Sequence, residues 1–448
     1  QHRSYGRPTR LEVSSGCSDF LCNTLRQEFN LPEGSLYRVP GPVNLVRMTQ
    51  LIDALPSPQL FFPKFVPGLA KQLKVGESLI EKLQSGDVLL HHPFEAFDTV
   101  LDLLREAVAD PKVLAIKQTV YRAGAHSELI ALLKEAVRRG KEVTVVVEIK
   151  ARFDEQTNIH YSELLEDVGA QVVYGVVGLK THAKLMLITR RESTGLKRYA
   201  HLSTGNYNPA TAKIYTDWGF MTASEAITAD VEQIFVHLAS QHKLPKMNKL
   251  LMAPFMLQDA IVNQIELLDR DASRGKKTRI VCKMNALTDV RIARALLSAA
   301  KSGVEVDLIV RGACILPAFE SQGTGRIRVR SVIGRFLEHT RVFYFESQGI
   351  DQLWLSSADF MSRNMIRRIE LAWPIEDANL KARILEEGLG LYLRDTENAW
   401  VLQPDGQYHQ IKVTEDPQTT GASKRITFDA HKALMQQYGA NTAIKAKA

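Results

Sequence analysis

The sequence of 448 residues has few cysteines and lacks long apolar runs. Its four cysteines form neither a CxxC pair nor a Cys/His spacing typical of zinc sites, so we expect free thiols in a reducing cytosol. The longest apolar runs, such as residues 143–147, have the length of a strand and fall short of the ~20 residues that cross a membrane. The first residues show no basic segment followed by an apolar one, so secretion is not indicated.

Neither sign of charge dominates the chain. Lys and Arg number 57 against 50 Asp and Glu, which gives a net charge of +7. This excess is compatible with a polyanionic partner but also occurs without one. The apolar fraction of 45% is ordinary for a soluble globular protein, and the length allows two or three domains. Residue 1 is Gln and the first segment reads as if entered midway, so we expect a fragment or a processed chain.

Two histidines occupy matching positions in the two halves of the chain. His182 is followed two residues later by Lys184, and His339 is followed in the same way by Arg341. The pattern alone means little, because 12 His and 57 Lys plus Arg would produce about 1.5 such triplets by chance. On a strand, however, residues two apart share a face, so each histidine and its cation can address one ligand.

The surroundings of the two histidines repeat as well. A β-prone apolar run follows each one, at residues 185–188 and 342–345, and a serine-rich turn comes later, at 203–206 and 356–359. A buried histidine at the start of a strand would explain either motif alone, but the repetition predicts a duplicated domain. Each half would contribute one imidazole and one cation to a shared site. Such a site suits phosphoryl chemistry, because imidazole can accept a phosphoryl group while fixed cations hold its oxygens.

Strands and helices alternate in both halves, which predicts the α/β class with two tandem domains and mostly parallel sheets. In the first half we expect strands at 113–121, 143–149 and 171–174 and helices at 127–139 and 159–168. In the second half we expect strands at 278–284, 304–310 and 327–332 and a helix at 289–301. The domains would cover residues 78–245 and 250–425. A partial helical domain would precede them at 1–75, with helices near 19–28 and 43–55, and a polar tail with one short helix would follow at 426–448.

Three arginines follow predicted strand ends. Arg122, Arg152 and Arg311 each come shortly after a strand, and ligand sites in such sheets gather at the carboxyl ends of strands. A guanidinium group offers a planar fork that matches phosphate oxygens. A solvated loop charge is the alternative for any one of them, but their matched positions favour a phosphate site.

The most distinctive motifs of the sequence are residues 151–155, 178–184, 199–208, 335–339 and 355–359. They resemble those of the long-chain polyphosphate kinases that autophosphorylate on histidine, and the resemblance covers roughly residues 1–425. The catalytic domains of that family are similar in fold to phospholipase D, which pairs two His-x-Lys motifs. The family also carries an N-terminal domain and a complete helical domain, so the resemblance implies an N-terminally truncated chain.

The resemblance implies a role for each histidine. His182 matches the histidine that becomes phosphorylated, and His339 matches a second active-site histidine that donates or relays a proton. Tyr215 and Arg311 match positions that contact the nucleotide, and His339 belongs to the same phosphate-binding set. Phospholipase D places an acid shortly after each motif, where this chain has Thr189 and Glu346. The first motif therefore lacks that acid, which favours the kinase.

The resemblance also implies a cation-lined site that uses Mg²⁺, with ATP as substrate. Arg122 and Arg152 match arginines associated with the magnesium site. Since arginine cannot ligate Mg²⁺, we interpret them as holding phosphates that the ion also touches. Lys184 and Arg341 would help to neutralise the phosphoryl group during transfer.

The expected function is reversible transfer of the ATP γ-phosphate to inorganic polyphosphate through a phosphohistidine. Two alternatives remain: a phospholipase D-like phosphodiesterase or nuclease, and a non-catalytic module that binds polyanions. The expected partners are ATP, ADP and polyphosphate, without nucleic acid. The resemblance further implies a cytoplasmic homo-oligomer that associates with the periphery of the inner membrane.

Overall fold

The computed structural model describes residues 8–55, 57–124, 127–149, 155–240, 242, 244–317, 319–320, 326–411 and 427–439. The chain divides into two compact units, Gln1–Lys64 and Phe65–Ala448. The larger unit contains both histidine motifs. Among the described residues, no helix combines the length and the apolar character that are needed to cross a bilayer.

The smaller unit contains a two-stranded parallel sheet and short helices. Helix α1 begins at Asp19 because Ser18 caps it, with the Leu21 amide donating to Ser18 Oγ at 3.3 Å. This helix coincides with the one expected near residues 19–28. The elements of the unit are β1 (Leu11–Ser14), α1 (Asp19–Glu28), η1 (Glu33–Ser35), β2 (Leu36–Val39), η2 (Leu45–Arg47), α2 (Met48–Ala54) and η3 (Pro58–Leu60).

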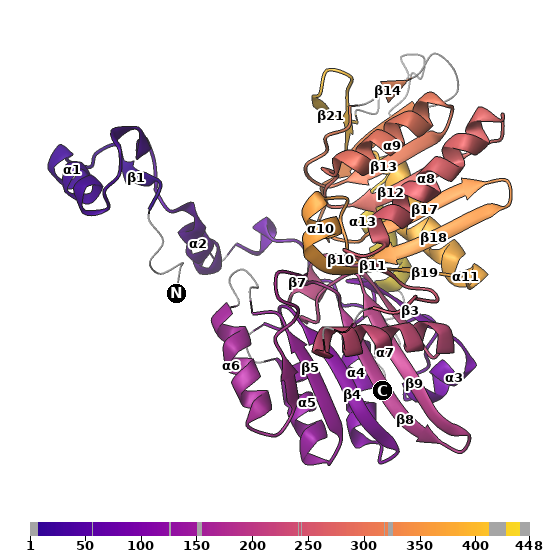
Figure 1. Ribbon diagram of the computed structural model, residues 1–448. Coiled ribbons are helices and arrows are strands. Elements are labelled where there is room, and N and C mark those ends of the chain that lie inside the picture. The colour runs from indigo at the N-terminus through magenta and orange to yellow at the C-terminus, as the bar shows by residue number, and fades with distance from the viewer. Residues whose placement is uncertain are drawn as a thin grey trace. The chain divides into compact units, whose positions relative to one another are not determined.

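The larger unit is built on two sheets, one for each half of the chain (Figure 1). The first sheet has the strand order β16-β10-β9-β8-β4-β5-β6, and β3 also pairs with β10. Its strands are β3 (Val88–His92), β4 (Val113–Val120), β5 (Glu142–Val147), β6 (Gln171–Val173), β8 (Leu185–Glu192), β9 (Gly195–Ser203), β10 (Tyr215–Thr222) and β16 (Leu337–Glu338). The helical segments in this half are α3 (Leu79–Ser85), α4 (Asp98–Ala109), α5 (Glu128–Arg138), α6 (Glu155–Glu166), η4 (Thr211–Lys213) and α7 (Glu225–Ser240).

The second sheet has the strand order β11-β19-β18-β17-β12-β13-β15-β20-β21, with β14 on β15 and β7 on β19. Its strands are β7 (Lys180–Thr181), β11 (Leu251–Ala253), β12 (Arg279–Met284), β13 (Glu305–Val310), β14 (Phe319–Glu320), β15 (Arg326–Val332), β17 (Val342–Ser347), β18 (Ile350–Ser356), β19 (Arg368–Pro374), β20 (Ala399–Leu402) and β21 (Tyr408–Gln410). The helices are α8 (Leu257–Ser273), α9 (Val290–Lys301), α10 (Ser362–Arg367), α11 (Ala378–Ile384), α12 (Leu391–Arg394) and α13 (Ala430–Gly439), and the π-helical turn η5 (Leu385–Gly390) joins α11 to α12.

The α/β class and the duplication are confirmed, but the sheets are mixed and not mostly parallel. Strands β4, β5 and β6 run parallel, as do β12, β13 and β15. Strands β8 and β9 form an antiparallel hairpin, and β17 and β18 form its counterpart. Only two residues separate β8 from β9, which is enough for a hairpin turn but far too few for the crossover that a parallel pair requires. The sequence marked the first residues of β8 and β17 as β-prone runs but gave no strand for β9 or β18, so the antiparallel returns were missed.

One apolar core joins the two halves. It contains Trp218 and Phe220 from the first sheet together with Leu355 and Trp373 from the second, all of them buried. Burying a large apolar side chain contributes about 1.5–3 kcal/mol, so a shared core of this kind holds the halves together firmly. The edges of the two sheets that carry the histidine motifs are therefore fixed against each other.

Candidate active site

The short strand before each histidine joins the sheet of the opposite half. Strand β7 lies just before His182 and pairs in parallel with β19 of the second half. Strand β16 leads into His339 and pairs in parallel with β10 of the first half. The amide of His182 also donates to the carbonyl of Ile369 on β19 at 2.9 Å. This exchange brings both histidines to the boundary between the two domains.

His182 is held by a carboxylate from the second half. Its Nδ1 lies 2.9 Å from Oε2 of Glu370 on β19, and the Ser357 hydroxyl donates to the same oxygen at 2.6 Å. Both His182 and Glu370 are buried. An ionised carboxylate can only accept hydrogen bonds, so Nδ1 carries the proton and the lone pair of the neutral ring lies on Nε2.

His339 is held in the same way by a carboxylate from the first half. Its Nδ1 lies 2.9 Å from both oxygens of Asp217 on β10, and Thr204 Oγ1 donates to Asp217 at 2.7 Å. On the other side of the ring, a guanidinium nitrogen of Arg341 lies 3.1 Å from Nε2. Arginine has no acceptor, so it donates and Nε2 accepts. His339 is therefore neutral here, with its proton on Nδ1.

The hydroxyl groups that hold the two carboxylates follow one spacing. Thr204 precedes Asp217 by 13 positions, and Ser357 precedes Glu370 by 13 positions. Each hydroxyl also accepts from the amide that follows its acid, at 3.0 Å in both halves. The serine-rich turns that the sequence singled out thus align the carboxylates that orient the histidines.

The two cations of the histidine motifs are buried and bound to their own motifs. Lys184 Nζ donates to the carbonyl of His182 at 2.5 Å, and Arg341 donates to the carbonyl of His339 at 2.6 Å. Arg341 also forms two hydrogen bonds with Asp359, at 3.2 and 3.1 Å. Their side chains stabilise the two histidine strands, while their charges act on the imidazoles nearby.

The electrostatic environment keeps both imidazoles neutral. Burial lowers the pKa of His182 well below its usual value, and the charges of Lys184, Arg368 and Arg341 lower it further. Burial and Arg341 also lower the pKa of His339, although Asp217 opposes them. Burial raises the pKa of Asp217, but His339 outweighs it and holds this pKa below its usual value. A neutral imidazole among cations can attack an electron-poor phosphorus atom.

Two further expected residues lie beside His339. The ring centroids of Tyr215 and His339 are 5.3 Å apart. Arg311 donates to the carbonyl of Glu338 at 2.9 Å, one residue before the histidine. Burial lowers the pKa of Arg311, and the charge of Arg341 adds to this effect. Both residues therefore border the same centre.

Of the two expected arginines in the first half, Arg122 lies within the described residues and Arg152 does not. Arg122 follows β4, and its guanidinium carbon lies 5.2 Å from the ring centroid of Tyr121. The Tyr121 ring is in turn 4.8 Å from that of His182, so Arg122 borders the centre through this tyrosine. Arg152 lies outside the described residues.

Three charged residues at the centre were missed by the sequence analysis. Asp217 and Glu370 orient the histidines, and Arg368 lies 3.6 Å from Glu370. The repeated 13-residue spacing from hydroxyl to acid could have identified both carboxylates, because it occurs in each half at matching positions. Arg368 had no comparable signal.

The described residues do not fit a protein-held Mg²⁺ site. Among them, no group of three or more His, Cys, Asp or Glu side chains is arranged to hold a metal ion. The carboxylates of the centre are already occupied, Asp217 and Glu370 by histidines and Asp359 by Arg341. Mg²⁺ prefers free oxygen ligands in octahedral geometry, which these hydrogen-bonded groups do not offer.

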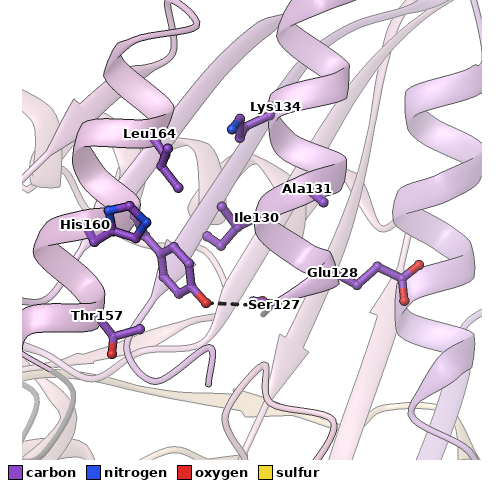
Figure 2. Close-up of a pocket in the computed structure, with 9 residues that line it drawn as sticks. Ser127, Glu128, Ile130, Ala131, Lys134, Thr157, His160 and Leu164 are labelled. Atoms are coloured by element: carbon purple, nitrogen blue, oxygen red, sulfur yellow. Dashed lines mark hydrogen bonds between the residues drawn. The ribbon is translucent and has the colours of Figure 1, made fainter. Parts of the chain in front are cut away.

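A separate cavity of about 540 Å³ lies between helices α5 and α6 (Figure 2). None of the residues that line it belongs to the histidine centre. The Ser127 amide donates to the hydroxyl of Tyr161 at 3.2 Å, and that hydroxyl donates to the carbonyl of Gly124 at 2.6 Å. Asn158 on α6 also donates to the carbonyl of Tyr121 at 2.8 Å. Helix α6 thus supports the segment that carries Arg122.

Comparisons with known proteins identify the relatives of this chain. Residues 78–244 match the family described as polyphosphate kinase C-terminal domain 1, and residues 250–422 match polyphosphate kinase C-terminal domain 2. The polyphosphate kinase of Neisseria meningitidis is 47% identical over 406 residues, which cover 91% of this chain and 59% of that protein. The Pseudomonas aeruginosa enzyme is 47% identical over 426 residues, covering 94% of this chain and 61% of its own length.

A solved structure agrees with these relatives. The crystal structure of polyphosphate kinase from Porphyromonas gingivalis matches with a TM-score of 0.83 and 34% identity, over 97% of this chain and 65% of that one. The chain spans about 60% of the length of the curated relatives that it matches. By sequence and by fold, the chain belongs to the polyphosphate kinase family.

Proposed function

We propose that the chain catalyses reversible phosphoryl transfer between ATP and inorganic polyphosphate through a phosphohistidine at His182. One observation carries this proposal. The neutral His182 ring has its Nδ1 bound to Glu370, which leaves the Nε2 lone pair available beside buried cations. This is the state that a nitrogen nucleophile requires.

The reaction would proceed in two displacements. In the first, Nε2 of His182 bonds to the γ-phosphorus of ATP, and the bond from that phosphorus to the bridging oxygen breaks, so that ADP leaves with the electron pair. In the second, the terminal oxygen of a polyphosphate chain attacks the same phosphorus, and the phosphorus–nitrogen bond breaks. Each step exchanges one high-energy phosphoryl bond for another, which makes the sequence reversible.

The surrounding residues would have two roles: some would counter negative charge, and His339 would hold or release a proton. Arg122, Arg152, Arg311, Lys184 and Arg341 would counter the negative charge that spreads over the equatorial oxygens in each transition state. Arg341 would act mainly through its field, because its donors are bound to Asp359, Thr204 and His339, whereas Lys184 donates to the carbonyl of His182.

His339 would hold or release a proton at Nε2. For this, the hydrogen bond that Arg341 donates to Nε2 has to open, and Asp217 stabilises the protonated ring that results. Tyr215 would pack beside the nucleotide, since its ring borders that of His339.

The domains 78–245 and 250–425 would together form the catalytic body. ATP would carry Mg²⁺ on its own phosphates, and the steps above use only residues of the chain. The family resemblance also motivates the proposal of a homo-oligomer in the cytoplasm, at the periphery of the inner membrane.

Labelling with γ-³²P-ATP tests the proposed function. We expect a label on His182 that is labile to acid and stable to base, and that moves to polyphosphate on a chase. His182→Ala should abolish it, whereas His160→Ala, which removes an exposed histidine of α6, should retain it. A wild-type chain that cleaves lipid or DNA without taking up label would instead support a phosphodiesterase. Binding of polyphosphate that survives His182→Ala, without any label in the wild type, would support a binding module.

A further inference from the structure

Glu338, the residue before His339, connects the histidine strand to three other elements. Its Oε2 lies 2.6 Å from Lys283 Nζ on β12 and accepts from Thr216 Oγ1 on β10 at 3.0 Å. Its Oε1 lies 2.5 Å from His431 Nε2 on α13. All four side chains are buried. A charged group in this position needs all of these partners, because an unpaired buried charge is strongly destabilising.

The direction of each hydrogen bond in this cluster can be assigned. The amide of Phe336 donates to Nδ1 of His431 at 3.3 Å, so the ring carries its proton on Nε2 and donates to Glu338. The single hydroxyl proton of Thr216 goes to Glu338, and its oxygen accepts the amide of His339 at 3.2 Å. Burial raises the pKa of Glu338, but Lys283 and His431 outweigh it and lower that pKa to about 2. The acid is therefore a permanent acceptor.

Helix α13 is anchored so that it can hold His431 in place. The amide of Ala430 donates to Asp395 at 2.8 Å, and Leu434 and Tyr438 are fully buried in the core that joins the two halves. In the same cluster, Lys283 Nζ lies 3.1 Å from the ring centroid of Tyr392 on α12, and that ring is 5.9 Å from the ring of His431. The C-terminal helices therefore enclose Glu338.

The first half lacks this arrangement at the matching position. Thr181 precedes His182 as Glu338 precedes His339, and its amide donates to Glu148 at 2.7 Å. In the first half the carboxylate is that of Glu148, which follows the end of β5, and no described residue of α13 takes part in this contact. Within the described ranges, the duplicated site is therefore asymmetric, with α13 connected to the proposed proton-handling histidine through Glu338.

We propose that Glu338 and His431 are positioning residues for His339. His431 orients Glu338, Glu338 orients the Thr216 hydroxyl, and that hydroxyl fixes the backbone of His339. Neither residue touches the reacting atoms. The inference rests on the proposed function, because it assigns a catalytic consequence to the position of His339. Since misplacing a catalytic group by about 1 Å can cost about 10²-fold in rate, a loosened His339 should slow turnover more than it weakens binding.

The test compares variants at two buried positions of α13. His431→Ala removes the donor to Glu338, and we expect kcat for polyphosphate synthesis to fall about tenfold or more while KM for ATP stays within about twofold. His431→Gln keeps an N–H donor and should restore most of kcat. The control is Leu434→Ala, which opens a cavity under the same helix without removing a polar contact of Glu338. It should lower the melting temperature yet keep kcat.

Three outcomes would overturn the inference. One is an unchanged kcat in His431→Ala, and another is an equal fall of kcat in Leu434→Ala at temperatures well below both melting points. The third is additivity: Glu338→Gln and His431→Ala should combine to a loss no greater than that of the worse single variant, whereas independent losses would multiply. If the wild type itself takes up no label at His182, the proposed function fails. A normal label with normal kcat in His431→Ala defeats only the positioning role.

Discussion

His182 and Glu370 are hydrogen-bonded across the boundary between the two halves of the chain, with Nδ1 and Oε2 2.9 Å apart. His339 and Asp217 form the reciprocal pair at the same distance. Each histidine therefore belongs to one half while the acid that orients it belongs to the other. Neither half supplies both members of either pair, so the proposed chemistry depends on both halves.

Glu370→Gln should slow phosphorylation of His182 by about 10²- to 10⁴-fold, as the loss of an orienting carboxylate does in other imidazole sites. The amide of Gln can donate to Nδ1, which moves the ring proton to Nε2 and removes the nucleophilic lone pair. Rapid-quench labelling with γ-³²P-ATP measures this step. The charge-matched control is Glu376→Gln, an exposed acid of the same half, which should label at the wild-type rate. Equal rates in the two variants would contradict the role of Glu370.

Asp217→Asn should change the pH dependence of turnover. The charge of Asp217 raises the pKa of His339, so its removal lowers that pKa further and leaves less of the protonated ring at neutral pH. We expect kcat to fall by about 10²-fold near neutrality and its alkaline limb to move to lower pH. Steady-state rates between pH 5 and 9 test this. A uniform loss with an unshifted profile would argue against proton handling by His339.

Gly205→Ala should disrupt the hydrogen bond between Asp217 and His339 by steric crowding. A Cβ at Gly205 would lie 2.1 Å from Oδ2 of Asp217, far inside van der Waals contact. The carboxylate would have to move and release His339, so we expect activity to fall by at least about tenfold. Gly86→Ala is the matched control, since its Cβ would meet no atom within 4 Å. Comparable activities in both variants would show that Asp217 can shift without consequence.

Stability should decrease between pH 7 and pH 5. Buried histidines in the larger unit have pKa values below the usual 6.5, with that of His91 lowered to about 4 and that of His201 to about 3, mainly by burial. The unfolded chain binds protons below pH 6.5 while the folded chain does not, so stability falls as the pH drops through 6.5. Lowering one histidine pKa from 6.5 to about 4 corresponds to about 3 kcal/mol.

Urea unfolding at pH 7.5, 6 and 5 measures this dependence. His160→Ala removes an exposed histidine and should show the same slope as the wild type. A free energy of unfolding that stays constant or rises toward pH 5 would contradict the prediction.

The regular elements could be predicted closely because their signals are local. The helix expected at 289–301 is α9, Val290–Lys301, and Asp289 caps it by accepting from the Ile292 amide at 3.0 Å. The strand expected at 143–149 is β5, Glu142–Val147. Apolar periodicity and a capping side chain are enough to define such elements.

Apolar periodicity and capping side chains could not identify the two carboxylates of the site. Asp217 and Glu370 lie 122 and 188 residues from the histidines that they orient, and each acts on a histidine of the other half. The positions where phospholipase D has its acids lie close to each histidine, and this chain has Thr189 and Glu346 there. Glu346 is exposed on β17, so the local position carries no partner for the ring. The partnership exists only because β7 and β16 exchange between the sheets, which no local pattern encodes.

The exchange of β7 and β16 has the form of a two-fold self-complementary interface, in which the same patch is used twice with the roles reversed. A single ancestral domain that paired with an identical copy about such an axis would have built two equivalent imidazole–acid couples without any duplication. In one fused chain the two couples need not stay equivalent, and the contact of Glu338 with His431 on α13 is a difference of this kind among the described residues.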